Sequence, residues 1–287
     1  HEISHHFEKS LHNPEGLQKE LLKNFQDIID SQEGSEIYRP TLFDLLAHTA
    51  LQFYKTDETS ITRPIDKFEI DNPELLCEAY AFTQLNIPNS DETSLQAKAL
   101  DLYQQLVSFH FSNPNLKPLV EVDIERLNYT YSKAVFPNKD SVLLEVLKES
   151  AENLKQHESS ALYRYEMASL IRTQGNNFQP EKGDDYRWKL KEAVDICDAV
   201  YADFPNSRGA EKCSVLKSQI LAPTLNITAE RNVPINQASR LLINYKNHDA
   251  LELKAYRVSQ KQLEELDNLY PIQKQRSYIM ALKLQTS

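Results

Sequence analysis

The sequence predicts a mainly α-helical protein with a C-terminal β part. We expect a tetratricopeptide-like array of helical hairpins over residues 1–217, then part of an antiparallel β-sandwich over residues 218–287. Apolar residues recur at three- and four-residue spacing through most of the chain, which indicates amphipathic helices. Beyond Pro223 they alternate, which indicates strands. The 13 prolines against 5 glycines suit helices that end at proline better than a glycine-rich α/β enzyme.

The clearest helical hairpin lies between residues 161 and 220. Its second helix has an apolar face and is expected to end at Pro205, because proline cannot continue a helix. This face contains Tyr186, Leu190, Ala193, Val194, Cys197, Val200, Tyr201 and Phe204. A small residue at Ala193 and a proline twelve positions later match the second helix of a tetratricopeptide unit. Gly175 is expected to form a left-handed cap on the first helix, and the loop over residues 176–185 is longer than in a standard repeat.

The same periodicity predicts seven more helices in the first domain. They are expected to begin near Pro14, Pro40, Pro73, Ser90, Pro118, Val142 and Ser207. The ending Phe136-Pro137-Asn138 recurs 68 residues later at positions 204–206, about twice the 34 residues of one tetratricopeptide unit. The array is therefore predicted to be degenerate.

Four strands are expected in the β part. Their apolar positions are Leu225, Ile227 and Ala229; Leu241, Ile243 and Tyr245; Leu251, Leu253 and Ala255; and Tyr278, Met280, Leu282 and Leu284. The turn residues 247–249 predict a hairpin, and a short helical insert is expected around residues 263–269. Four strands make a thin sheet for a free-standing domain. The sheet is therefore expected either to pack on the last helices or to continue as a sandwich beyond Ser287.

Charge argues against nucleic acid as a partner. The net charge is −10, and it divides into −13 before Ser218 and +3 from Ser218 onward. An acidic surface repels phosphates. It is typical of a solvated helical domain, and an acidic docking face is the alternative. No run of about 18 apolar residues and no signal peptide is recognised, so no membrane-spanning segment is predicted.

Motifs for catalysis and metal binding are weak. Residues 1–5 read HEISH, a literal HExxH zinc pattern, but it stands at the start of the chain, before Pro14, with no third ligand in view. There is no GxSxG nucleophile motif, and carboxylates such as Asp44 are given no acid or base role. We therefore predict no catalytic residue, no metal site and no cofactor.

Two sets of side chains remain candidates for cross-linking or binding. Cys197 and Cys213 stand at similar distances on either side of Pro205, so antiparallel helices would bring them to a similar height. Either a disulfide bridges them, or both remain reduced in the core. The second set consists of the aromatic residues Tyr163, Tyr165, Tyr186 and Trp188. These line a stacking groove for a peptide or a sugar, or belong to the core, as aromatic residues at helical spacing usually do.

Several segments resemble bacterial alpha-2-macroglobulins. Residues 225–230 (LNITAE), 239–247 (SRLLINYKN) and 251–258 (LELKAYRV) look like the first macroglobulin-type β-sandwich of that family. Residues 7–15 (FEKSLHNPE) and 39–46 (RPTLFDLL) resemble the helical N-terminal extension found in members of the Bacteroidetes type. The resemblance covers most of the chain, and it implies that the β part is a macroglobulin-like domain, truncated if the sandwich continues.

This resemblance implies a function and a compartment. Members of the family are envelope proteins that entrap proteases after cleavage of a bait segment, and many carry a Cys-x-x-Gln thioester. None of Cys77, Cys197 and Cys213 has glutamine at the third following position, and no bait loop is evident. The resemblance therefore implies a non-enzymatic N-terminal scaffold of a protease-trapping protein, with a protease or an envelope protein as partner.

The implied location is the bacterial periplasm or cell envelope, with any anchor being a lipid upstream of residue 1. An oxidising compartment of this kind favours the disulfide between Cys197 and Cys213. The alternative function is a surface glycan-binding protein of the tetratricopeptide-containing nutrient-uptake type, in which the aromatic residues stack on sugars.

Overall fold

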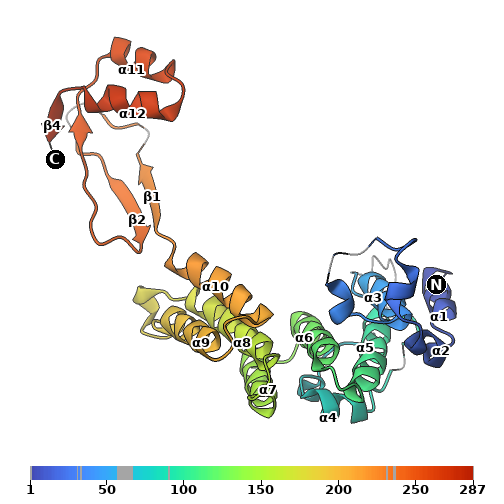
Figure 1. The fold of residues 1–287 in the computed structure, drawn as a ribbon. Helices are drawn as coiled ribbons and strands as arrows, with labels where there is room; N and C mark the ends of the chain where they lie inside the picture. The colour runs from blue at the N-terminus through green and yellow to red at the C-terminus, as the bar shows by residue number, and fades with distance from the viewer. Residues whose placement is uncertain are drawn as a thin grey trace. The chain divides into compact units, whose positions relative to one another are not determined.

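The structure, a computed structural model, describes residues 2–30, 32, 34–56, 67–89, 91–230, 232–234 and 237–286. The chain divides into two compact units, His1–Ile220 and Leu221–Ser287 (Figure 1). The first unit is helical, and the second contains small antiparallel sheets. The chain is therefore mainly α-helical with a C-terminal β part. The boundary expected between residues 217 and 218 lies inside the helix α10 (Arg208–Leu221).

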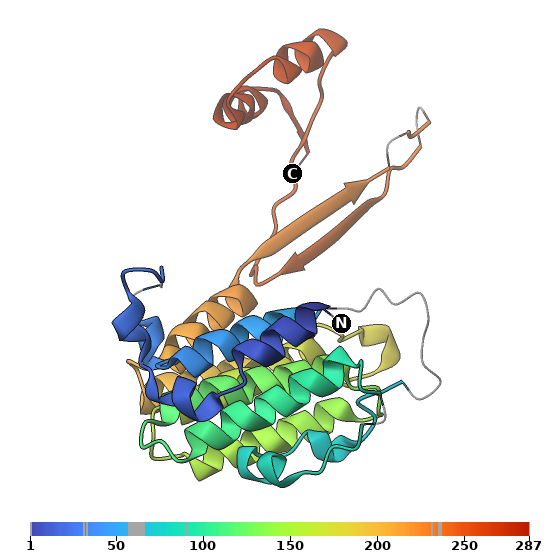
Figure 2. The same ribbon diagram turned by 90° about the vertical axis from the view of Figure 1, so that its right-hand side faces the viewer.

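Unit 1 consists of helices that pack against their neighbours in the sequence. The earlier helices are α1 (Glu2–Ser10), α2 (Pro14–Lys19), α3 (Leu42–Tyr54), α4 (Ala79–Gln84) and α5 (Leu95–Phe111). They are followed by α6 (Leu116–Lys133), α7 (Lys139–Asn153), α8 (Ser160–Gly175), α9 (Lys189–Asp203) and α10. Short 3-10 turns are η1 (Leu22–Phe25), η2 (Ser35–Ile37), η3 (Pro73–Leu75) and η4 (Pro180–Lys182). Contacts are richest between α5 and α6, α7 and α8, and α8 and α9, whose axes run side by side in Figure 2.

Polar caps fix where several helices begin. Thr41 and Asp44 form a reciprocal capping box at α3, in which the amide of Thr41 donates to Asp44 at 2.9 Å. The expected cap at Ser207 is confirmed, because its hydroxyl accepts the amide of Ala210 at 3.1 Å. The predicted start near Ser90 is wrong. Ser90 lies outside the described residues, and α5 is capped by Ser94.

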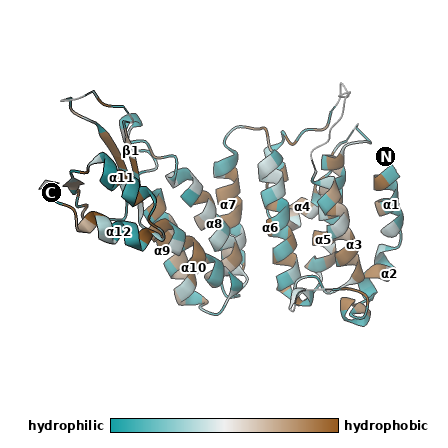
Figure 3. Ribbon diagram, turned by 90° about the horizontal axis from the view of Figure 1, so that it is seen from above, coloured by the Kyte–Doolittle hydropathy of each residue, from teal (hydrophilic) through white to brown (hydrophobic). Residues whose placement is uncertain are grey.

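The core of unit 1 has a larger cluster and a smaller one among the described residues. The larger joins helices α3 to α8 through side chains such as Phe43, Phe82 and Leu127, and the smaller joins α8, α9 and α10. The helices are accordingly striped teal and brown in Figure 3, as amphipathic helices around a core should be. Gly209 permits the closest approach, because a Cβ there would lie 2.4 Å from the carbonyl carbon of Ala161.

Two predicted helices are interrupted by contacts from elsewhere in the chain. The helix expected from Pro14 to Gly34 breaks after α2, because Leu22 donates its amide to the carbonyl of Pro40 at 2.9 Å. The helix expected from Pro73 becomes η3 followed by α4. Around the junction of η3 and α4, the guanidinium of Arg126 donates hydrogen bonds to the carbonyl oxygens of Leu75 and Cys77. A continuous helix would have used these carbonyl groups internally.

The helical hairpin of α8 and α9 also differs in detail from the prediction. Gly175 does not form a left-handed cap, since positive φ among the glycines is confined to Gly34 and Gly183. Instead a Cβ on Gly175 would lie 2.9 Å from Leu190, so glycine is needed for close packing of the two helices. Tyr186, expected inside the second helix, lies before it with φ of 65°.

Unit 2 is a small α/β arrangement. It contains β1 (Thr224–Ala229), β2 (Leu241–Lys246), β3 (Ala255–Tyr256), α11 (Gln260–Asp267), α12 (Ile272–Met280) and β4 (Leu284–Thr286). β1 pairs with β2, and β3 pairs with β4, both antiparallel. The helical insert is confirmed as α11. The strand predicted over residues 278–284 is wrong in its first part, because Tyr278 and Met280 belong to α12. Of the strand predicted over residues 251–255, only Ala255 lies in β3. The hairpin predicted at residues 247–249 is wrong as well, because β2 pairs with β1 and β3 pairs with β4.

Candidate functional site

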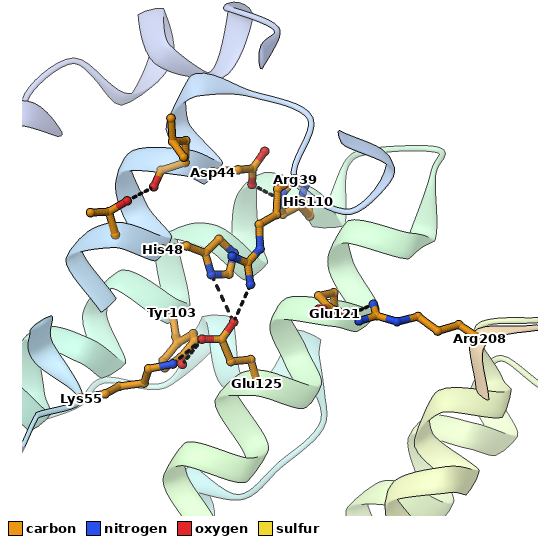
Figure 4. A network of polar contacts seen from close by, with 11 residues as sticks. Arg39, Asp44, His48, Lys55, Tyr103, His110, Glu121, Glu125 and Arg208 are labelled. Carbon is orange, nitrogen blue, oxygen red and sulfur yellow. Dashed lines mark hydrogen bonds and ion pairs between the residues drawn. The ribbon is translucent and has the colours of Figure 1, made fainter. Parts of the chain in front are cut away.

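Three carboxylates of α6 reach three different parts of unit 1. Glu121 pairs with Arg208 of α10 at 2.6 Å, and the hydroxyl of Tyr163 on α8 donates to Asp123 at 2.7 Å. Glu125 faces α3 and α5 instead (Figure 4). Asp123 points away from Glu121 and Glu125, because residues two apart on a helix face nearly opposite directions, and Glu121 and Glu125 lie one turn apart along the helix axis. One short acidic stretch therefore connects α6 to several neighbours.

Glu125 is surrounded by donors. Lys55 lies 2.5 Å from one carboxylate oxygen, which also accepts the hydroxyl of Tyr103 at 3.1 Å. The other oxygen lies 3.1 Å from Nδ1 of His48 and 3.5 Å from Arg39. Burial raises the pKa of Glu125, but hydrogen bonds and charge from His48 and Lys55 together outweigh it and lower the pKa to about 2. Such a carboxylate is a weak base, and its geometry suits structural cross-linking of α3, α5 and α6.

A second buried carboxylate, Asp44, joins α3 to α5. One of its oxygens completes the cap of α3, and the other lies 2.6 Å from Nε2 of His110. Asp44 and His110 are 0 % and 1 % exposed, and Nδ1 of His110 has no hydrogen-bond partner. Since both side chains are shielded from water and come from α3 and α5, the pair links these two helices. No local sequence pattern indicates this contact, because its two residues lie far apart in the chain.

The structure brings Cys197 and Cys213 together. Both are buried as free thiols in the smaller core cluster, and each lies near enough to shift the pKa of the other. Burial and the charges of Asp123 and Glu78 raise the pKa of the third cysteine, Cys77, to about 11, against an opposing effect of Arg126. The predicted pairing partners are thus neighbours, and the bridge itself stays a prediction.

The four predicted aromatic residues do not form one site. Tyr163 is buried against Asp123, and Tyr165 is half-buried beside the Nζ atom of Lys212, 4.8 Å from its ring. By contrast, Tyr186 and Trp188 are 47 % and 66 % exposed at the start of α9. These two rings are the exposed ones of the four, although the guanidinium of Arg187 lies 5.1 Å from the ring centre of Trp188.

Two grooves of unit 1 share Arg208 in their walls. Its guanidinium lies 4.6 Å from the ring of Tyr38, and these two residues line both cavities, each of about 290 Å³. Lys117, at the edge of one cavity, pairs with Glu158 at 2.9 Å. Since each cation already faces a carboxylate, these grooves are polar without an excess of positive charge.

A third groove, of about 310 Å³, lies between the extended segments 67–72 and 85–88. Phe68, Leu75 and Ile87 contribute apolar walls. Asp71 and Glu74 line it without an ion-pair partner in the described chain. This arrangement suits an apolar side chain flanked by positive charges.

Unit 2 presents an unusual apolar surface. In the register of β1 and β2, Leu225 lies opposite Tyr245, Ile227 opposite Ile243, and Ala229 opposite Leu241. Because side chains alternate along a strand, these six residues share one face of the ribbon, which we call the apolar ribbon face. Figure 3 colours β1 predominantly hydrophobic. None of the side chains described between residues 221 and 283 is buried, so this face has no core to cover it within the described part of the unit.

The described residues show neither a candidate metal site nor a candidate membrane-spanning helix. Their His, Cys, Asp and Glu side chains form no group of three or more suited to a metal ion, and His1 of the HExxH pattern lies outside the described residues. Within the described chain, no helix is both long and apolar enough to cross a membrane. Comparison with family models, with curated proteins and with solved structures finds no match to this chain.

Proposed function

We propose that the chain is a non-enzymatic scaffold, the N-terminal region of an exported alpha-2-macroglobulin-like protease-trapping protein. In this proposal, unit 1 is a tetratricopeptide-like docking module and unit 2 is part of a macroglobulin-like β-sandwich. The observation that carries the proposal is the apolar ribbon face. A two-stranded ribbon is at best marginally stable alone, whereas a sandwich buries one apolar face of each sheet against the other.

The packing of unit 1 supports a docking role. Ala193 and Gly175 allow α8 and α9 to approach closely, as the helices of a tetratricopeptide hairpin do. The carboxylates of Asp44, Glu121, Asp123 and Glu125 are held in ion pairs and hydrogen bonds, which favours a rigid scaffold over acid and base chemistry. The groove at residues 67–88 offers a place for a segment of a protein partner that carries lysine or arginine beside an apolar residue.

Site-specific photo-cross-linking tests the proposal. A photoreactive residue at Ile227, on the apolar ribbon face, is expected to cross-link in envelope fractions to polypeptides with macroglobulin-type β domains. The matched control is Asn226, the neighbouring residue on the opposite face of the ribbon. Equal cross-linking from both positions would count against a buried ribbon face, and hydrolysis of peptides by the purified chain would contradict a non-enzymatic scaffold.

One observation favours the glycan-binding alternative, namely the exposure of Tyr186 and Trp188. Exposed aromatic rings are natural stacking surfaces for sugars, and the exposed pair of Arg187 and Asp184 beside them supplies polar groups for hydroxyl groups. Isothermal titration against a panel of oligosaccharides distinguishes the two functions. Under this alternative, Trp188→Ala abolishes binding and Tyr201→Ala, which removes another exposed aromatic residue of the same region, leaves it unchanged.

A further inference from the structure

Two cysteines from different helices meet in the core of unit 1. Cys197 on α9 and Cys213 on α10 are 2 % and 1 % exposed. The two thiols lie near enough for each to shift the pKa of the other, and both are free. Because α9 and α10 bury both cysteines in the same core cluster, side-chain rotation and a local backbone adjustment would bring the sulfur atoms to the ~2.0 Å of a covalent S–S bond.

We propose that Cys197 and Cys213 are a redox-modification site, at which a reversible intramolecular disulfide cross-links α9 to α10. This site does not depend on the function proposed above. The oxidant is another disulfide, either a small molecule such as glutathione disulfide or a protein of the thiol–disulfide exchange class.

The reaction consists of two exchange steps. The Cys197 thiolate attacks one sulfur of the donor disulfide, which forms a mixed disulfide and releases the first thiol. Cys213 then attacks the sulfur of Cys197, which closes the intramolecular bond and releases the second thiol. The two cysteines lose two electrons and two protons, and the donor disulfide gains both as two thiols.

The surroundings of the two thiols indicate which of them attacks the donor disulfide first. Interaction with Cys213 lowers the pKa of Cys197, whereas interaction with Cys197, together with burial, raises the pKa of Cys213. Cys197 is therefore the first nucleophile. Apolar neighbours such as Val200 and Leu216 cover both thiols, so exchange requires local opening of this helix pair and is expected to be slow in the closed state.

Cys77 provides an internal control. It packs against the larger core cluster instead of the smaller one, and its raised pKa of about 11 keeps it protonated at neutral pH. It is therefore expected to remain a thiol while the other two react.

The test treats the full chain with glutathione disulfide in urea concentrations at which far-UV circular dichroism shows it still folded. Peptide mass spectrometry without reduction is expected to recover the Cys197 and Cys213 peptides linked, lighter by two hydrogen atoms than the sum of the free peptides. The bridged chain is expected to unfold roughly 5 to 10 °C higher than the reduced chain. Cys77→Ala is expected to give the same result.

Other outcomes overturn the proposal. These are recovery of both cysteines as thiols after treatment, recovery of separate glutathione adducts on each, and linkage only between different chains. Cys213→Ala adds a second readout, because the Cys197 adduct should then accumulate. If this variant does not fold, the result with the unmodified chain still decides the matter.

Discussion

The hydroxyl of Tyr163 on α8 donates a 2.7 Å hydrogen bond to Asp123 on α6, and both side chains are shielded from water. The other carboxylate oxygen of Asp123 accepts from Arg126, whose side chain is 0 % exposed. The guanidinium of Arg126 lies 4.3 Å from the ring centre of Phe82 and donates to the carbonyl groups before α4. One buried ion pair thus holds α6, α8 and the start of α4 together.

Replacing the cation of this pair should be costly. Arg126→Met leaves the Asp123 carboxylate buried without a counter-charge, so we expect the free energy of unfolding to fall by about 3 to 5 kcal/mol. Urea denaturation followed by circular dichroism measures the change. Arg187→Met is the control, because its pair with Asp184 is exposed and should contribute at most about 1 kcal/mol. A similar small loss for both variants would contradict a structural role for Arg126.

Glu125 should make stability depend on acid pH. Its pKa of about 2 in the folded chain is below the ordinary 4.5, so the unfolded chain takes up its proton first as the pH falls. The stabilisation is present above pH 4.5 and disappears between about pH 4.5 and 2, and it amounts to at most about 3 kcal/mol at neutral pH.

Glu125→Gln is therefore expected to unfold at lower urea concentration than the unmodified chain at pH 7, with a difference that shrinks below pH 4.5. Urea titrations at pH 7, 5, 4 and 3 measure it. Glu145→Gln, at an exposed position of α7, should show little difference at any of these values. A constant gap between Glu125→Gln and the unmodified chain across the whole range would argue against the assigned pKa.

Gly209 should not tolerate a side chain. Its added Cβ would lie 2.4 Å and 2.5 Å from the carbonyl carbon and oxygen of Ala161, and backbone atoms cannot rotate away. Gly209→Ala should therefore lower the free energy of unfolding by about 1 to 3 kcal/mol despite the better helix propensity of alanine. Ser214→Ala, on the exposed side of the same helix, should change it by no more than about 0.5 kcal/mol. Thermal unfolding distinguishes the two, and a more stable Gly209→Ala would show that α8 and α10 are farther apart.

The apolar ribbon face should govern association without contributing to the stability of the chain alone. Ile227 is 47 % exposed, so Ile227→Lys is expected to change thermal unfolding little while lowering the fluorescence of a bound hydrophobic dye and any self-association seen in sedimentation. Thr228→Lys places the same charge on the opposite face of the ribbon and should leave dye binding unchanged. If both variants bind the dye equally, the face is not the hydrophobic surface of this unit.

The sequence was sufficient for the main helices because their signals are local. Three- and four-residue spacing, proline ends and the cap at Ser207 all act within one turn of helix, and α6 and α7 accordingly appear close to where these signals lie. The change to alternating residues after Pro223 likewise located β1 and β2. The local pattern was insufficient where a short apolar run fits both the helical period of 3.6 residues and the strand period of 2. Tyr278 and Met280 are an example, because they were predicted in a strand and lie in α12.

Tertiary structure alone decided which polar groups are buried and what they contact. Asp123, Glu125 and Asp44 look like ordinary surface carboxylates in the sequence, yet each meets partners from distant segments. The break between η3 and α4 also depends on a distant residue. The guanidinium of Arg126 donates to backbone carbonyl groups that would otherwise accept hydrogen bonds within a continuous helix. Hydrophobic periodicity identifies only the side of a helix that is buried. Ion pairs and close glycine contacts depend on which helices become neighbours, and the choice of neighbours is made only when the whole chain packs.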